Sequence, residues 1–168
     1  EKFVGKGDNI IIGESEHHSN IVPWQLLCEK TGAEIRVLPI AESGEYDVNA
    51  LSTLMDEHTK LVCVAQISNV LGVLNPIEDI VRLAHGKNIK VVVDGAQGAV
   101  HLNTDVQKMD CDFYAFSGHK MFASTGTGVL YAKKELLEVM PPFLGGGEMI
   151  GTVTFKRTTY AELPYKFE

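Results

Sequence analysis

The sequence has no run of basic residues, no long apolar run and no pair of closely spaced cysteines. Its 168 residues carry 15 Lys and Arg against 22 Asp and Glu, a net charge of −7, which argues against nucleic acid as a partner. A membrane span needs about 18 or more apolar residues, so we expect no membrane association. The first residues, EKFVGKGDN, do not resemble a signal peptide, and we expect a cytoplasmic protein.

The three cysteines, Cys28, Cys63 and Cys111, lie far apart in the sequence. They form neither a disulfide framework nor a zinc-binding pattern, so we predict no metal site. Cys63 lies within the apolar run LVCVAQI and is expected in the core. No GxGxxG sequence follows a predicted strand, which disfavours a dinucleotide-binding domain.

Apolar segments alternate between strand-like and helix-like patterns along the whole chain. Strands are predicted at 9–12, 34–40, 61–67, 89–93, 113–116, 128–132 and 152–155, and helices at 21–30, 47–57, 77–86 and 133–140. Ser19 or Asn20 is predicted to cap the first helix, and Gly32 to end it. The strands at 61–67 and 89–93 are apolar on both faces. This predicts an α/β fold, a mostly parallel sheet with helices on both faces.

Polar residues follow several of these strands, at the point where each strand ends. They are His17, Asn69, Asp94, Gln97, Ser117, His119 and Lys120. Right-handed crossovers put the carboxyl ends of parallel strands at one edge, where ligands of open α/β sheets bind. We therefore expect these side chains to line one rim of the sheet.

Lys120 lies in a tight turn between two apolar strands, 113–116 and 128–132. A desolvated lysine loses its proton more easily and can attack carbonyl groups to form a Schiff base. A lysine, a strand-end carboxylate, imidazoles and small donors together suit pyridoxal 5'-phosphate (PLP). Taken singly, each residue also fits a turn, a cap or a solvated loop. His18, His58, His85 and His101 are interpreted as structural.

The segments EHHSNIVPWQ, SNVLG, VVDGAQ and FSGHKMFASTGTGVLY resemble the group II (SUF-type) cysteine desulfurases. These enzymes belong to the class V aminotransferase branch of fold-type I PLP enzymes, and the resemblance covers essentially the whole chain. It implies that Lys120 is the Schiff-base lysine, that Asp94 pairs with the pyridine nitrogen and that His17 stacks on the ring and lies near the substrate for proton transfer.

The resemblance also implies roles for the other four residues. Gln97 would donate to the ring hydroxyl, and Asn69 would lie near that hydroxyl and the substrate carboxylate. Ser117 and His119 would bind the phosphate.

The resemblance further implies a parent protein larger than this chain. Residues 1–168 are expected to be part of the large PLP-binding domain, inactive alone, with an N-terminal segment and a C-terminal small domain outside them. The parent would be a homodimer that converts L-cysteine to L-alanine, or acts on selenocysteine, and passes sulfur to an acceptor protein of iron–sulfur assembly. The nucleophilic cysteine and the carboxylate-binding arginine would lie outside residues 1–168. The alternatives are another class V enzyme, such as an aminotransferase, epimerase or kynureninase-like hydrolase, or a non-catalytic chain.

Overall fold

A computed structural model describes residues 3–167 of the chain. These residues fall into two compact units, one up to residue 131 and the other from residue 132 onward. The first unit contains most of the sheet and all seven predicted site residues. The second is a small helix-and-hairpin unit.

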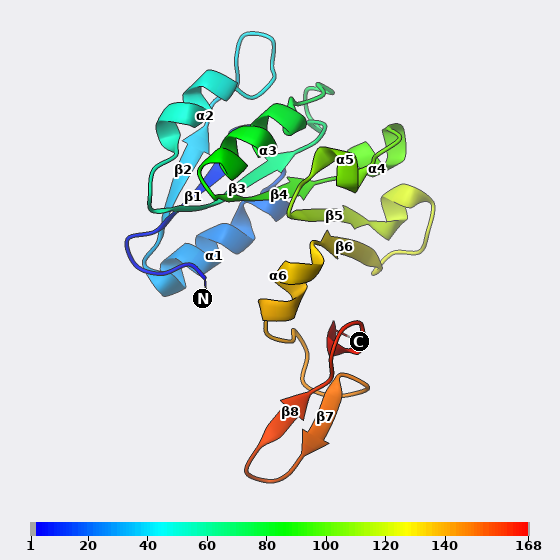
Figure 1. Ribbon diagram of the computed structural model, residues 1–168. Helices are drawn as coiled ribbons and strands as arrows, with labels where there is room; N and C mark the ends of the chain where they lie inside the picture. Colours follow the sequence, from blue (N-terminus) through cyan, green and yellow to red (C-terminus); the bar gives the residue numbers. More distant parts are fainter. Residues whose placement is uncertain (1–2, 168) are drawn as a thin grey trace. The chain divides into compact units, whose positions relative to one another are not determined.

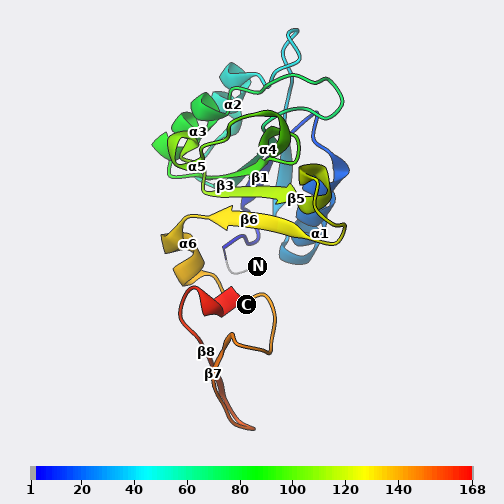
Figure 2. The same cartoon turned by 90° about the vertical axis from the view of Figure 1, so that its right-hand side faces the viewer.

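The first unit is organised around a six-stranded sheet (Figure 1). The strands are β1 (Asn9–Gly13), β2 (Glu34–Leu38), β3 (Thr59–Ala65), β4 (Lys90–Asp94), β5 (Phe113–Ser117) and β6 (Gly128–Ala132). Their order is β2-β1-β3-β4-β5-β6, and all pairings from β2 to β5 are parallel. Figure 2 shows that β6 runs opposite to β5. The predicted mostly parallel sheet is confirmed.

Helices cover both faces of this sheet, as predicted. Helix α1 (Val22–Thr31) lies on one face, and α2 (Val48–Leu54) and α3 (Ile77–Gly86) lie on the other (Figure 2). Two short helices, α4 (Gly98–His101) and α5 (Val106–Met109), complete the second layer. Parallel strands need such crossovers, because a two-residue turn cannot join them.

Each face of the sheet has its own apolar core. Ile10, Ile12 and Cys63 pack toward α1, so the predicted burial of Cys63 is confirmed. A larger cluster on the other face includes the helix positions Ile77, Ile80, Val81 and Ala84. Their spacing places them on one side of α3. Burying each of the larger side chains contributes roughly 1.5–3 kcal/mol.

The prediction that Ser19 or Asn20 caps the first helix is wrong. Helix α1 begins at Val22 without a side-chain cap, because a separate 3₁₀ helix, His18–Asn20, precedes it. The side chain of His17 accepts a hydrogen bond from the Ser19 N–H and so caps that 3₁₀ helix. Gly32 ends α1 as predicted, in the left-handed region with φ of 77°.

An ionic cluster lies just before β5, at the amino end of that strand. The side chain of Asp112 is fully buried and accepts a hydrogen bond from the Val91 N–H at 2.8 Å. It also pairs with His85 Nε2 at 2.7 Å and with Lys90 Nζ at 3.4 Å. His85 therefore has the structural role expected from the sequence.

The second unit contains α6 (Lys134–Val139), the hairpin of β7 (Ile150–Val153) and β8 (Thr158–Tyr160), and a 3₁₀ helix, Tyr165–Phe167. The strand predicted at 152–155 begins and ends two residues earlier, because Thr154 closes the hairpin turn through hydrogen bonds with Arg157. Lys166 Nζ donates to the carbonyls of Leu137 and Glu138. Within residues 3–167, no helix combines the length and the apolar character that crossing a membrane requires.

Candidate active site

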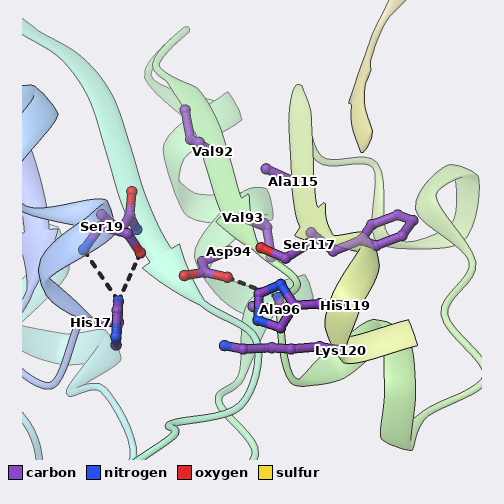
Figure 3. A pocket seen from close by; sticks show the side chains of 12 residues that line it. His17, Ser19, Val92, Val93, Asp94, Ala96, Ala115, Ser117, His119 and Lys120 are labelled. Carbon is purple, nitrogen blue, oxygen red and sulfur yellow. Dashed lines mark hydrogen bonds between the residues drawn. The ribbon is translucent and has the colours of Figure 1, made fainter. Parts of the chain in front are cut away.

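A cavity of about 460 Å³ opens at the carboxyl edge of the sheet (Figure 3). Its lining comes from the segments that end β1, β4 and β5. Five of the seven predicted site residues meet there: His17, Asp94, Ser117, His119 and Lys120. Its volume is within the range of small-molecule sites, and Val92, Val93, Ala96, Ala115 and Phe116 supply apolar walls.

Asp94 is the last residue of β4, and its carboxylate lines the cavity. Its Oδ1 accepts a hydrogen bond from the Ala96 N–H at 2.8 Å, so Asp94 also closes the turn after the strand. The next residue, Gly95, has no room for a side chain, since a Cβ there would lie 2.0 Å from the Tyr114 ring. Tight packing behind the turn therefore fixes where this carboxylate points.

Lys120 belongs to a 3₁₀ helix, Gly118–Met121, that directly follows β5. The Gly118 N–H donates to the Thr127 carbonyl at 2.9 Å, which closes the predicted tight turn. The side chain is half-buried. Figure 3 shows the Lys120 amine and the Asp94 carboxylate directed into the space on whose far side His17 lies. An amine, a carboxylate and an imidazole thus converge from three strand ends.

Hydrogen bonds set the tautomer of His17. Its Nδ1 lies 3.2 Å from the Ser19 backbone nitrogen and 2.8 Å from Ser19 Oγ. A backbone N–H can only donate, so Nδ1 accepts, and the neutral ring carries its proton on Nε2. The ring of His18 lies beside it, with ring centroids 4.1 Å apart and the two rings tilted by 36°. The imidazole is therefore held at one nitrogen and can donate a proton at the other.

The other two predicted residues, Asn69 and Gln97, do not line this cavity. They meet in a neighbouring hollow of about 310 Å³, together with Ser68 and His101. Asn69 lies in the loop after β3, and Gln97 precedes α4, so both are carried past the strand ends. The predicted single rim is thus divided in two, and His101, interpreted as structural from the sequence, lines the second hollow.

Glu16 and the cavity-lining residues Ser19 and Asn20 are not among the site residues predicted from the sequence. Glu16 is 8% exposed and accepts hydrogen bonds from Tyr46, Asn20 and Ala65. Burial raises the pKa of its carboxyl group to about 7, and the negative charge of Asp94 adds to this rise. The sequence offers one local signal for these residues, because Glu16 and Asn20 lie four residues apart, on either side of His17.

Comparison with known proteins gives this geometry a context. The family model for "Aminotransferase class-V" matches residues 1–168. A cysteine desulfurase of Cronobacter sakazakii is 56% identical over 163 residues, which cover 96% of this chain and 40% of that protein. The chain thus spans about two fifths of the length of the curated relatives it matches.

Solved structures have the same fold. The crystal structure of the cysteine desulfurase CsdA from Escherichia coli superposes with a TM-score of 0.95 at 45% identity, covering 98% of this chain and 41% of that one. C-DES, described as a cystine C–S lyase, superposes with a TM-score of 0.86 at 28% identity, covering 98% of this chain and 45% of that one. One C-DES structure contains glycine covalently linked to its PLP cofactor. Since the family match extends over every residue, the chain belongs to the class-V aminotransferase family.

Proposed function

We propose that residues 1–168 form part of the large domain of a PLP-dependent cysteine desulfurase of the group II (SUF) type. The observation that carries the proposal is the meeting of Lys120, Asp94 and His17 around one cavity at the carboxyl edge of the sheet. The relatives named cysteine desulfurase, which are 52–56% identical to this chain, support the choice among class V activities.

The donor set of the cavity fits PLP. An amine is present for the aldehyde, a carboxylate for the ring nitrogen, and apolar side chains for the ring faces. Ser117 and His119 offer a hydroxyl and an imidazole for the phosphate. When bound, PLP withdraws electron density from the α-carbon of an amino acid and so lowers the barrier to proton removal there.

Each of the predicted site residues then has a proposed role. Lys120 Nζ would hold the cofactor covalently and move a proton to or from the substrate. Asp94 would keep the ring nitrogen protonated. His17 would stack on the ring and offer the Nε2 proton, because its Nδ1 is engaged by Ser19. Asn69 and Gln97 are proposed to reach the ring hydroxyl, and Asn69 the substrate carboxylate as well, from the neighbouring hollow.

The proposed reaction transfers the sulfur of L-cysteine to a cysteine thiol outside residues 1–168. The C–S bond of the substrate breaks, an S–S bond to the protein thiol forms, and the thiol proton ends on the product methyl group. The products are L-alanine and a protein persulfide, from which an acceptor protein of iron–sulfur assembly takes sulfur. Selenocysteine is proposed as a second substrate. We further propose a cytoplasmic homodimer, and that residues 1–168 alone do not turn over L-cysteine.

A second candidate activity has an observation in its favour. C-DES combines the same fold with PLP, and cysteine persulfide is its reaction product. A C–S lyase would therefore use the same lysine and aspartate. Formation of alanine from L-cysteine favours the desulfurase, whereas cysteine persulfide formed from cystine favours the lyase. An aminotransferase, epimerase or kynureninase-like hydrolase would carry out neither of these two conversions, and a non-catalytic chain would not bind PLP.

The test is a Lys120→Ala variant of the full-length protein, compared with Lys108→Ala. Lys108 is exposed on α5 and pairs with Glu78, so it controls for the loss of a positive charge. We expect Lys120→Ala to lose the visible absorbance of covalently held PLP. Its rate of alanine formation from L-cysteine should fall at least about a hundredfold. Lys108→Ala should keep both. An unchanged spectrum in Lys120→Ala would refute the role of the lysine.

A further inference from the structure

The Glu16 carboxylate joins its own turn, residues 16–20, to Tyr46 and to the carboxyl end of β3. Its Oε1 accepts from the Ala65 N–H at the end of β3, at 2.6 Å, and from the Tyr46 hydroxyl. Its Oε2 accepts from Asn20 Nδ2 at 2.7 Å. All three neighbours donate, so their hydrogen bonds favour the ionised carboxylate, which only accepts, and they oppose the burial that raises its pKa. Hydrogen bonds to a charged acceptor are also about twice as strong as neutral ones.

Asn20 transmits this constraint to the cavity. Its side chain lines the cavity, and both ends of its amide are engaged. Nδ2 donates to Glu16, while Oδ1 accepts from Trp24 Nε1 at 3.0 Å. Turning the amide over would set a donor against the Trp24 donor and an acceptor against the carboxylate. The orientation of Asn20 therefore depends on Glu16.

The same short turn positions His17. The Asn20 N–H donates to the His17 carbonyl at 2.8 Å, which links the backbones of the two residues. Glu16 is also the residue directly before His17. Glu16 accepts from the end of β3 and Asn20 donates to Glu16, so these bonds hold the 16–20 turn against the strand.

The Tyr46 side of the network is equally constrained. Its ring lies so close to Gly13 that a Cβ there would be 2.4 Å from it. The Tyr46 N–H donates to Asn75 Oδ1 at 3.1 Å, and Asn75 Nδ2 donates to the Ala65 carbonyl at 2.8 Å. Close packing and hydrogen bonds therefore hold Tyr46 in place beside the Glu16 carboxylate.

We propose that Glu16 is a positioning residue of the cofactor site, which acts by holding the His17–Asn20 turn on the carboxyl end of β3. Glu16 is not among the residues that line the cavity, so its effect on PLP passes through Asn20 and His17. This proposal rests on the proposed function, since it concerns the same cavity.

A charge swap tests the proposal in the full-length protein. In Glu16→Gln the new amide places a donor opposite Asn20 Nδ2, so the side chain of Asn20 must turn and break its bond with Trp24. In the double variant Glu16→Gln/Asn20→Asp the direction of the hydrogen bond is reversed. The carboxylate at position 20 then accepts from both the position-16 amide and Trp24, and every polar atom has a partner again. Glu14→Gln is the matched control, because Glu14 is exposed and accepts from the Ile40 N–H.

The readouts are the dissociation constant of PLP, the visible spectrum of the bound cofactor and the melting temperature of the cofactor-free protein, all at pH 8. We expect Glu16→Gln to weaken PLP binding about tenfold and to change the spectrum. The double variant should recover both to within about threefold, and Glu14→Gln should match wild type. If Glu16→Gln lowers only the melting temperature while PLP binding and spectrum stay unchanged, the role of Glu16 is purely structural and the proposal is overturned.

The outcomes also separate this proposal from the proposed function. Wild-type protein that binds PLP and forms alanine upholds the function, whatever the variants do. If Glu16→Gln does not fold, the double variant still decides: recovery of folding and of PLP binding supports the proposal. Recovered folding with PLP binding still weak, or no recovery of folding at all, overturns it.

Discussion

Substituting Glu16 by Gln should remove a specific pH dependence of stability. Burial, followed by the smaller effect of Asp94, raises the pKa of this carboxyl group from 4.5 to about 7 in the folded protein. The folded state therefore keeps the proton after the unfolded chain has released it. This contribution to stability is fully present below pH 4.5, falls as the pH rises from 4.5 to 7, and is absent above pH 7.

The magnitude follows from the two pKa values. A tenfold change in proton affinity is worth about 1.4 kcal/mol, so the rise from 4.5 to about 7 is worth about 3 kcal/mol. Roughly 2.5 kcal/mol of this falls between pH 5 and pH 8. Gln has nearly the same shape and does not titrate. Any constant cost of its hydrogen bonds cancels when the same variant is compared at two pH values.

The assay is urea unfolding of the cofactor-free protein, followed by circular dichroism at pH 5 and pH 8. The free-energy difference between wild type and Glu16→Gln should change by roughly 2.5 kcal/mol between the two pH values, with wild type losing relative stability at pH 8. Glu14→Gln removes a comparable charge from an exposed position and serves as the control. A wild-type minus Glu16→Gln difference that is the same at both pH values would refute the argument that burial controls this carboxyl group.

Two further substitutions test the packing at the two edges of the sheet, Asp112 at the amino edge and Gly95 at the carboxyl edge. Asp112→Asn should lower the free energy of unfolding by about 2 kcal/mol in the same urea assay, because an uncharged amide weakens the hydrogen bonds that the fully buried Asp112 Oδ2 makes with the Val91 N–H and with His85 Nε2; a loss below about 1 kcal/mol would contradict this. Gly95→Ala should lower the free energy of unfolding by about 2 kcal/mol, since its Cβ would lie 2.0 Å from the Tyr114 ring. Gly86→Ala, which has open space around it, is the control and should not lower it. Equal melting temperatures for these two variants would show that the turn after β4 can relax.

The apolar pattern of the sequence is enough to predict the sheet and which polar residues follow its strands. The strands at 61–67 and 89–93 are apolar on both faces, and only a sheet covered on both sides buries such strands. Once the strands are parallel, crossovers place their carboxyl ends at one edge. Asp94 and Lys120 therefore had to meet near that edge. The tight turn around Lys120 was likewise readable from its flanking apolar strands and its glycines.

The folded chain sets how the predicted residues divide between two hollows and which contacts support them. Asn69 and Gln97 share the edge with Asp94, but the loop after β3 and the start of α4 carry them into a separate hollow. The edge of the sheet at which a residue lies follows from the alternation of strands and helices along the chain. The direction of its side chain depends on loop geometry, which no periodic sequence pattern predicts.

Glu16 shows the same limit for a charge. Its partners Tyr46 and Ala65 lie 30 and 49 residues away in sequence, so no local pattern announces the contact. Folding brings three donors around one carboxylate, and desolvation then raises its pKa. The sequence shows an acidic residue beside His17. Only the folded chain shows that its carboxylate links the His17–Asn20 turn to the sheet.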